Sequence, residues 1–139
     1  MKYLLYLLLF LFMANCRDKN VAPELLQPLV GKWRLVAYER VENGSKVWKE
    51  VDPHSPSFVF FRFDGVVLDS KELPYCCPPS ALNINGKKFE IVPKAVIPEN
   101  PVCAYVDCIG CATWEIELTG DEFILQLCGW SKSKYVRVP

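Results

Sequence analysis

Cysteine is the residue type whose number and spacing suggest the most chemistry in this chain of 139 residues, which contains seven. Six of them lie in the second half of the chain: Cys76, Cys77, Cys103, Cys108, Cys111 and Cys128. An even number of cysteines in an exported domain predicts a disulfide framework. The spacing Cys103-x4-Cys108-x2-Cys111 leaves a second interpretation open, because thiolates spaced in this way can surround zinc. We expect disulfides, since no CxxC pair stands on each side of a gap, and we predict no metal and no cofactor.

The remaining polar residues do not form a catalytic pattern. His54 is the only histidine, and no nucleophile motif such as GxSxG accompanies it. Glu115 and Glu117 alternate with apolar residues, which is typical of a solvated strand face. We therefore predict that the protein is not an enzyme. The 16 basic and 16 acidic side chains cancel, and the formal net charge of zero argues against a nucleic-acid partner.

The seventh cysteine, Cys16, follows an apolar segment. Residues 4–13 form an unbroken apolar run after Lys2. As a helix this run would extend about 15 Å, too short for a hydrocarbon core of about 30 Å, and it fits the apolar region of an export signal. Met13-Ala14-Asn15-Cys16 resembles the lipobox of bacterial lipoprotein signals, with Asn15 where Gly, Ala or Ser is usual. The resemblance implies cleavage before Cys16 and acylation of its thiol, which would anchor the domain to a bilayer.

We therefore expect three parts: a signal peptide at 1–15, a lipidated cysteine with a tether at 16–27, and a domain at 28–139. The expected location is the bacterial cell envelope, lipid-anchored to the outer membrane. A plain secretory peptide followed by a coincidental cysteine is the alternative.

The pattern after residue 28 predicts an all-β domain. Short apolar or alternating segments are separated by turn sequences, and beyond the signal no segment shows helical periodicity. Asn85-Gly86 is the strongest hairpin signal and places Leu82 opposite Phe89. Seven to nine short strands joined by tight turns are typical of an up-and-down barrel or a sandwich. We expect strands near 33–38, 46–51, 57–64, 66–68, 82–84, 87–92, 114–118, 123–127 and 134–138.

The last predicted hairpin bears on the cysteine pairing. A turn at residues 119–122 places Trp114, Ile116 and Leu118 opposite Leu127, Leu125 and Phe123. In that register Cys128 lies diagonal to Cys111, so a Cys111–Cys128 bridge is geometrically reasonable. Bridges from Cys76 and Cys77 to Cys103 and Cys108 would join the irregular segments, and which cysteine bonds to which stays open.

The two ends of the domain resemble a known family. Gly31-Lys32-Trp33 resembles the G-x-W start of lipocalin-like (calycin) barrels, and Tyr135-Val136-Arg137 resembles their closing strand. The resemblance, closest to the small lipoproteins of the Bacteroidetes type, covers about residues 28–138. It implies an antiparallel up-and-down β-barrel of about eight strands. One end would be closed by Arg137 lying over Trp33, a cation–π contact worth roughly 0.5–2 kcal/mol.

Two features of the sequence stand apart from that family. The Pro- and Cys-rich insert around 74–111 is not part of its pattern. Trp33-Arg34-Leu35 also resembles the first strand of META/HslJ-like β domains, although their Gly-Cys-Asn element is missing. A META/HslJ-like domain or a sandwich is therefore the alternative fold.

The resemblance and the aromatic content lead to two functional hypotheses. In the first, the barrel binds a small hydrophobic ligand at its open end, in a pocket lined by Tyr38, Trp48, Phe58 and Phe60. In the second, the core is filled, and the disulfide-tied insert presents a surface to another envelope protein. Fold resemblance alone does not decide between them.

Overall fold

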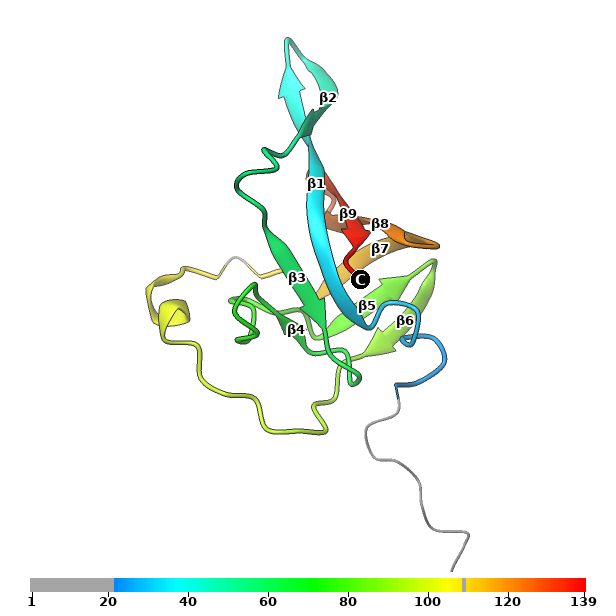
Figure 1. Ribbon diagram of the computed structural model, residues 1–139, viewed down its shortest axis with the longest axis vertical. Helices are drawn as coiled ribbons and strands as arrows, with labels where there is room; N and C mark the ends of the chain where they lie inside the picture. Colours follow the sequence, from blue (N-terminus) through cyan, green and yellow to red (C-terminus); the bar gives the residue numbers. More distant parts are fainter. Residues whose placement is uncertain (1–21, 109) are drawn as a thin grey trace, which may run out of the picture.

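Nine β-strands and one short 3₁₀-helix make up the fold in the computed structural model, which describes residues 22–108 and 110–139 (Figure 1). The predicted all-β class is confirmed. The expected signal peptide, Cys16 and most of the tether lie outside the described residues. Within the described ranges, no helix has the length and apolarity that crossing a bilayer requires. The elements are β1 (Gly31–Glu42), β2 (Ser45–Glu50), β3 (Phe58–Phe61), β4 (Val67–Leu68), β5 (Ala81–Ile84), β6 (Lys87–Glu90), η2 (Pro101–Tyr105), β7 (Thr113–Thr119), β8 (Glu122–Leu127) and β9 (Lys132–Arg137).

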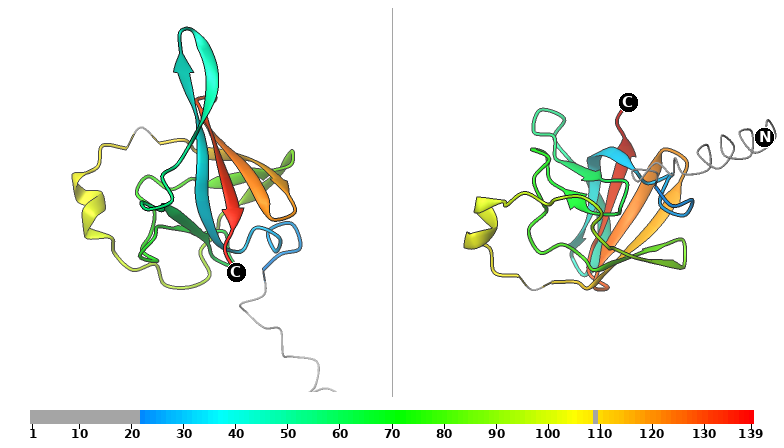
Figure 2. Two further views of the ribbon diagram at one scale, coloured as in Figure 1. Left: turned by 45° about the horizontal axis from the view of Figure 1, so that its top comes forward. Right: turned by 90° about the horizontal axis from the view of Figure 1, so that it is seen from below.

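The strands form one curled sheet in the order β4-β3-β1-β9-β8-β7-β5-β6, and β2 pairs with the distal half of β1 (Figure 2). Neighbouring strands are antiparallel except β5 and β7, which are parallel. This pair differs from the expected up-and-down order because of the insert. The long connection that parallel neighbours require consists of β6 and the insert that follows it, and it brings β7 beside β5. The result is a half-barrel with a mixed sheet.

Local turn chemistry sets the two best-defined hairpins. Asn85 and Gly86 both have positive φ, as the turn between β5 and β6 requires, and Leu82 pairs with Phe89 as predicted. The β7–β8 register also matches the prediction, with Trp114 opposite Leu127 and Ile116 opposite Leu125. These pairs place every second side chain of β7 and β8 on the inner face of the sheet.

Packed aromatic rings fill the inner face near one end of the half-barrel. Trp33, Phe61 and Phe123 are fully buried, and Phe123 meets the edge of Trp33 at a centroid distance of 4.8 Å and stacks on Tyr135 at 4.7 Å. Leu26 and Leu29, just before β1, are also fully buried, and Leu29 O accepts a 2.8 Å hydrogen bond from the Trp33 indole. We call this the closed end of the half-barrel.

The two edges of the sheet are connected not by strand pairing but by hydrogen bonds between an ion pair in the β3–β4 turn and the backbone beyond β6. In the turn between β3 and β4, the Arg62 guanidinium donates two hydrogen bonds of 2.8 and 2.7 Å to the buried Asp64 carboxylate. Asp64 accepts a third bond of 2.7 Å from the Lys94 N–H beyond β6, and Arg62 also donates to Val96 O at 3.1 Å. Burial alone would raise the pKa of Asp64, but the Arg62 and Lys94 hydrogen bonds and the Arg62 charge outweigh it and lower the pKa.

Candidate functional site

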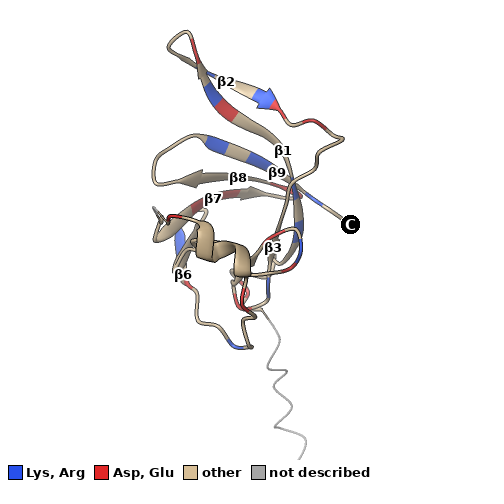
Figure 3. Cartoon of the chain, turned by 90° about the vertical axis from the view of Figure 1, so that its left-hand side faces the viewer, with Lys and Arg blue, Asp and Glu red and all other residues tan. Residues whose placement is uncertain are grey.

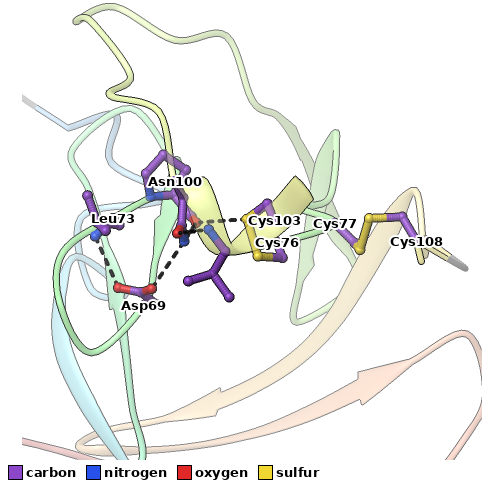
Figure 4. Close-up of a disulfide and its surroundings, with 9 residues drawn as sticks. Asp69, Leu73, Cys76, Cys77, Asn100, Cys103 and Cys108 are labelled. Atoms are coloured by element: carbon purple, nitrogen blue, oxygen red, sulfur yellow. Dashed lines mark hydrogen bonds between the residues drawn. A yellow bond between two sulfur atoms is a disulfide. The ribbon is translucent and has the colours of Figure 1, made fainter. Parts of the chain in front are cut away.

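Two disulfides, Cys76–Cys103 and Cys77–Cys108, join distant parts of the insert to each other (Figure 4). A third, Cys111–Cys128, joins the end of the insert to the residue that follows β8. The predicted disulfide framework is confirmed, and the alternatives left open by the sequence are resolved. Their Cα–Cα distances of 5.1, 5.3 and 5.6 Å lie in the usual range. The six described cysteines are all used in these bonds, so none of them is a free thiolate for zinc.

The end of the half-barrel opposite the closed end contains a cleft of about 450 Å³, which we call the open-end cleft. Trp114 and Leu127, the last inward-facing pair of β7 and β8, lie at its base. The insert forms one wall through Tyr75, Cys76 and Cys77, and Tyr75 meets the face of Trp114 edge-on at a centroid distance of 5.4 Å. The remaining lining comes from the Cys111–Cys128 bridge and its neighbours, Gly110, Trp130 and Ser131.

Trp130 forms the outer wall of the cleft and is 71% exposed. Cys128 and Gly129 have positive φ, and the Trp130 N–H donates a 2.8 Å hydrogen bond to Leu127 O. Gln126 also donates to Trp130 O at 3.1 Å. The backbone under Trp130 is therefore held in place, while its large apolar side chain lies in solvent. An exposed aromatic ring at the mouth of a cleft is a typical contact for a bound molecule.

The described residues that line the open-end cleft carry no charged side chain. Their polar side-chain groups are the Tyr75 and Ser131 hydroxyls and the indole N–H groups of Trp114 and Trp130, besides the disulfide sulfurs. Nearby, burial raises the pKa of the Tyr135 phenol, and Tyr75 raises it further. Tyr135 is thus neutral at physiological pH. This arrangement suits an uncharged apolar or aromatic molecule, because a charged ligand would lose its hydration without gaining a partner.

The four residues predicted to line the pocket are not brought together. Val59 and Phe61 of β3 face inward with Trp33, so Phe58 and Phe60 lie on the outer face of the sheet. The Lys32 ammonium is 4.4 Å from the centroid of the Phe58 ring.

Tyr38 and Trp48 lie on opposite faces of the β1–β2 hairpin, because Trp48 pairs with Glu39 rather than with Tyr38. Trp48 instead lines a groove of about 650 Å³ on the outer face, whose other residues include Arg34, Glu50, Asp52 and Lys134. The prediction of a pocket lined by these four residues is therefore wrong. Strand alternation places them on different faces, and aromatic side chains fill the interior where the pocket was expected.

Trp33 and Arg137 occupy the places that the lipocalin-like resemblance implies. The Arg137 guanidinium carbon lies 4.2 Å from the centroid of the Trp33 ring. Arg137 also donates hydrogen bonds to Pro28 O, to Val30 O at 3.1 Å and to the Asp121 carboxylate at 2.9 Å. These contacts hold the segment before β1 against the closed end.

The other polar candidates lie on the surface. His54 is in an exposed loop, where its backbone N–H donates to the Asp52 carboxylate at 2.9 Å. Glu115 and Glu117 are on the exposed face of β7, where Asn83 and Lys132 donate to them. Among the residues that the structure describes, no three His, Cys, Asp or Glu side chains are placed to hold a metal ion.

Sequence reasoning missed Tyr75 and Trp130. The signal that was present is their position, since each lies within two residues of a cysteine.

No family model, no curated protein and no solved structure matches the chain.

Proposed function

We propose that this protein is an exported binding module whose open-end cleft takes a small, uncharged apolar or aromatic molecule. The observation that supports this most is the cleft's uncharged lining with an exposed Trp130 at its mouth. A volume of about 450 Å³ falls within the range of small-molecule sites, about 300–1,000 Å³. The proposal keeps the ligand class expected from the sequence but moves the site from the barrel interior to the cleft.

The proposal includes a lipid anchor at Cys16 and a place in the bacterial cell envelope, on the outer membrane. The described chain begins next to the closed end, where residues 26–30 pack under Trp33. An anchor preceding this segment would attach the domain by its closed end, so the open-end cleft would face away from the bilayer. Ligand would then reach it from the aqueous side or from a partner protein.

Ligand binding is tested by thermal shift and tryptophan fluorescence against a panel of uncharged compounds: fatty alcohols, retinol, sterols and simple aromatic compounds. The wild type should show a saturable shift with at least one compound. Trp130→Ala should weaken the apparent affinity for that compound at least tenfold, because the substitution removes the outer wall of the cleft. Trp48→Ala is the matched control, since Trp48 is also an exposed tryptophan but lies outside the cleft.

The proposal fails if no panel compound shifts the wild type, or if Trp130→Ala binds as well as Trp48→Ala. The anchor is tested separately by fractionating cells that express Cys16→Ala. This variant should leave the membrane fraction, and its retention there would contradict the lipid anchor.

A further inference from the structure

The insert contains the most exposed apolar side chains in the described part of the molecule. Tyr105 is 91% exposed, Val96 is 90% exposed and Val102 is 60% exposed. None of the five residues of η2 is buried. A short segment that bears several such side chains is unusual on a soluble domain, because apolar groups gathered in this way are unfavourable in water.

The backbone beneath these side chains is held at several points. Asn100, just before η2, donates hydrogen bonds to Pro74 O at 2.8 Å and to the Asp69 carboxylate at 3.3 Å (Figure 4). Its own side-chain oxygen accepts from the Val102 N–H at 3.3 Å. The disulfides of Cys103 and Cys108 hold η2 and the residues that follow it. The exposed side chains are thus carried on a fixed frame rather than on a free loop.

One face of η2 is bonded to the rest of the insert, and another face carries exposed apolar side chains. A 3₁₀-helix has three residues per turn, so Val102 and Tyr105 lie one above the other on the same face. Cys103 lies on another face and bonds to Cys76. We call Val102 and Tyr105 the η2 ridge. Because the ridge is already ordered, a partner that contacts it loses less conformational entropy on binding than it would with a flexible loop.

The charges around the ridge indicate what kind of surface it fits. Residues 95–108 contain two acidic side chains, Glu99 and Asp107, and no basic one. In the cartoon of Figure 3, the short η2 helix is tan, because none of its five residues is Lys, Arg, Asp or Glu. Apolar segments that bind anionic bilayers carry Lys and Arg beside their apolar residues, so the ridge has the opposite charge pattern. A basic surface would be the electrostatic complement.

A second copy of this chain offers a poor complement at its outer groove. Its outer groove beside Trp48 contains Arg34 and Lys134, but it also contains Glu50 and Asp52. This balanced charge gives no attraction for an acidic ridge.

We propose that the η2 ridge is a docking surface for a different protein, one that offers an apolar pocket with a rim of Lys and Arg. Tyr105 inserts into the pocket, and Glu99 and Asp107 face the basic rim. Val102 and Tyr105 line no part of the open-end cleft, so this proposal does not depend on the ligand proposed above.

The test is photo-crosslinking in cells that express the full chain, with a benzophenone amino acid at position 105. Position 87, the exposed first residue of β6, is the matched control. We expect a discrete adduct with another protein from position 105 and none from position 87. Mass spectrometry should map the adduct to a partner surface rich in Lys and Arg.

A charge-reversal variant makes the test specific. Glu99→Lys combined with Asp107→Lys should lower the yield of the adduct at least tenfold, because it removes the complementarity at exposed positions. Glu24→Lys combined with Glu72→Lys, also at exposed positions, should leave the yield of the adduct unchanged.

Four outcomes would overturn the proposal: an adduct with lipid, an adduct with a second copy, no adduct at all, or an adduct that survives charge reversal at Glu99 and Asp107. Thermal shift with a cleft ligand should be the same in all of these variants, which separates this test from that of the proposed function.

Discussion

The closed end and the open end of the half-barrel are ordered by different means. At the closed end, Leu26, Leu29 and Trp33 are fully buried, and Arg137 covers the Trp33 ring. At the open end, disulfides hold irregular segments in place while Trp130 lies 71% exposed. Packing orders side chains by burying them, whereas a disulfide orders the backbone and leaves the side chains accessible. The closed end therefore contributes buried packing to the stability of the fold, whereas the open end keeps apolar side chains exposed.

The largest expected effect on stability comes from removing the buried Trp33 side chain at the closed end. Trp33→Ala deletes a buried ring that contacts Phe123 and donates to Leu29 O. We expect a loss of about 3–5 kcal/mol in the free energy of unfolding, measured by denaturant titration. The matched variant Trp48→Ala, at a position 46% exposed, should cost less than about 1 kcal/mol. Equal costs for the two variants would contradict the assignment of the core to the closed end.

The second effect concerns the covalent links at the open end. Cys111→Ala combined with Cys128→Ala removes a bridge with a sequence separation of 17. A loop of this length predicts a loss of about 3 kcal/mol in the free energy of unfolding. The variant should also lose binding in the open-end cleft, because both cysteines line it. Retained ligand affinity in this variant would show that the disulfide does not shape the cleft.

A smaller effect on stability, one that depends on pH, is expected at the contact between the two sheet edges. Arg62→Met leaves the buried Asp64 without its ion-pair partner, and we expect a loss of about 2 kcal/mol at pH 7. The pKa of Asp64 in the folded protein lies below its ordinary value of 3.8. Its stabilising contribution is therefore complete above that pH and is lost as pH falls through the folded-state pKa. Denaturant titrations from pH 7 to pH 2 should show the two proteins converging only at the acid end, and a constant difference would contradict this role.

The cation–π contact at the closed end should have the smallest effect on stability. Arg137→Gln removes the guanidinium over Trp33, and we expect a loss of about 1 kcal/mol. Thermal unfolding is the measurement, with Lys134→Gln on the same strand as the control. A variant as stable as the control would show that the Arg137 guanidinium, through its ring contact and its hydrogen bonds, does not stabilise this end.

The sequence predicted what local periodicity decides. The turn at Asn85-Gly86 and the pairing of Trp114 with Leu127 follow from turn chemistry and alternation within single hairpins. The parallel pairing of β5 with β7 could not be predicted in this way, because it depends on the route of a crossover of about twenty residues.

The candidate site was harder to predict than the fold. Phe58 and Phe61 look alike in sequence, and only the pairing of Trp33 with Val59 shows which of them faces inward. The insert that builds the cleft has no periodicity, so its disulfides were predictable as a set, but the exposure of Trp130 was not.

The binding role of the open end is tested most directly by the four tryptophan indole N–H signals in an NMR titration with apolar and aromatic compounds. One signal reports the closed end (Trp33), one the outer groove (Trp48), and two the open-end cleft (Trp114 and Trp130). We predict that a binding compound shifts the signals of Trp114 and Trp130 and leaves those of Trp33 and Trp48 in place. A compound that shifts the Trp33 or Trp48 signal instead, or a full panel that shifts none, would contradict a binding site at the open end.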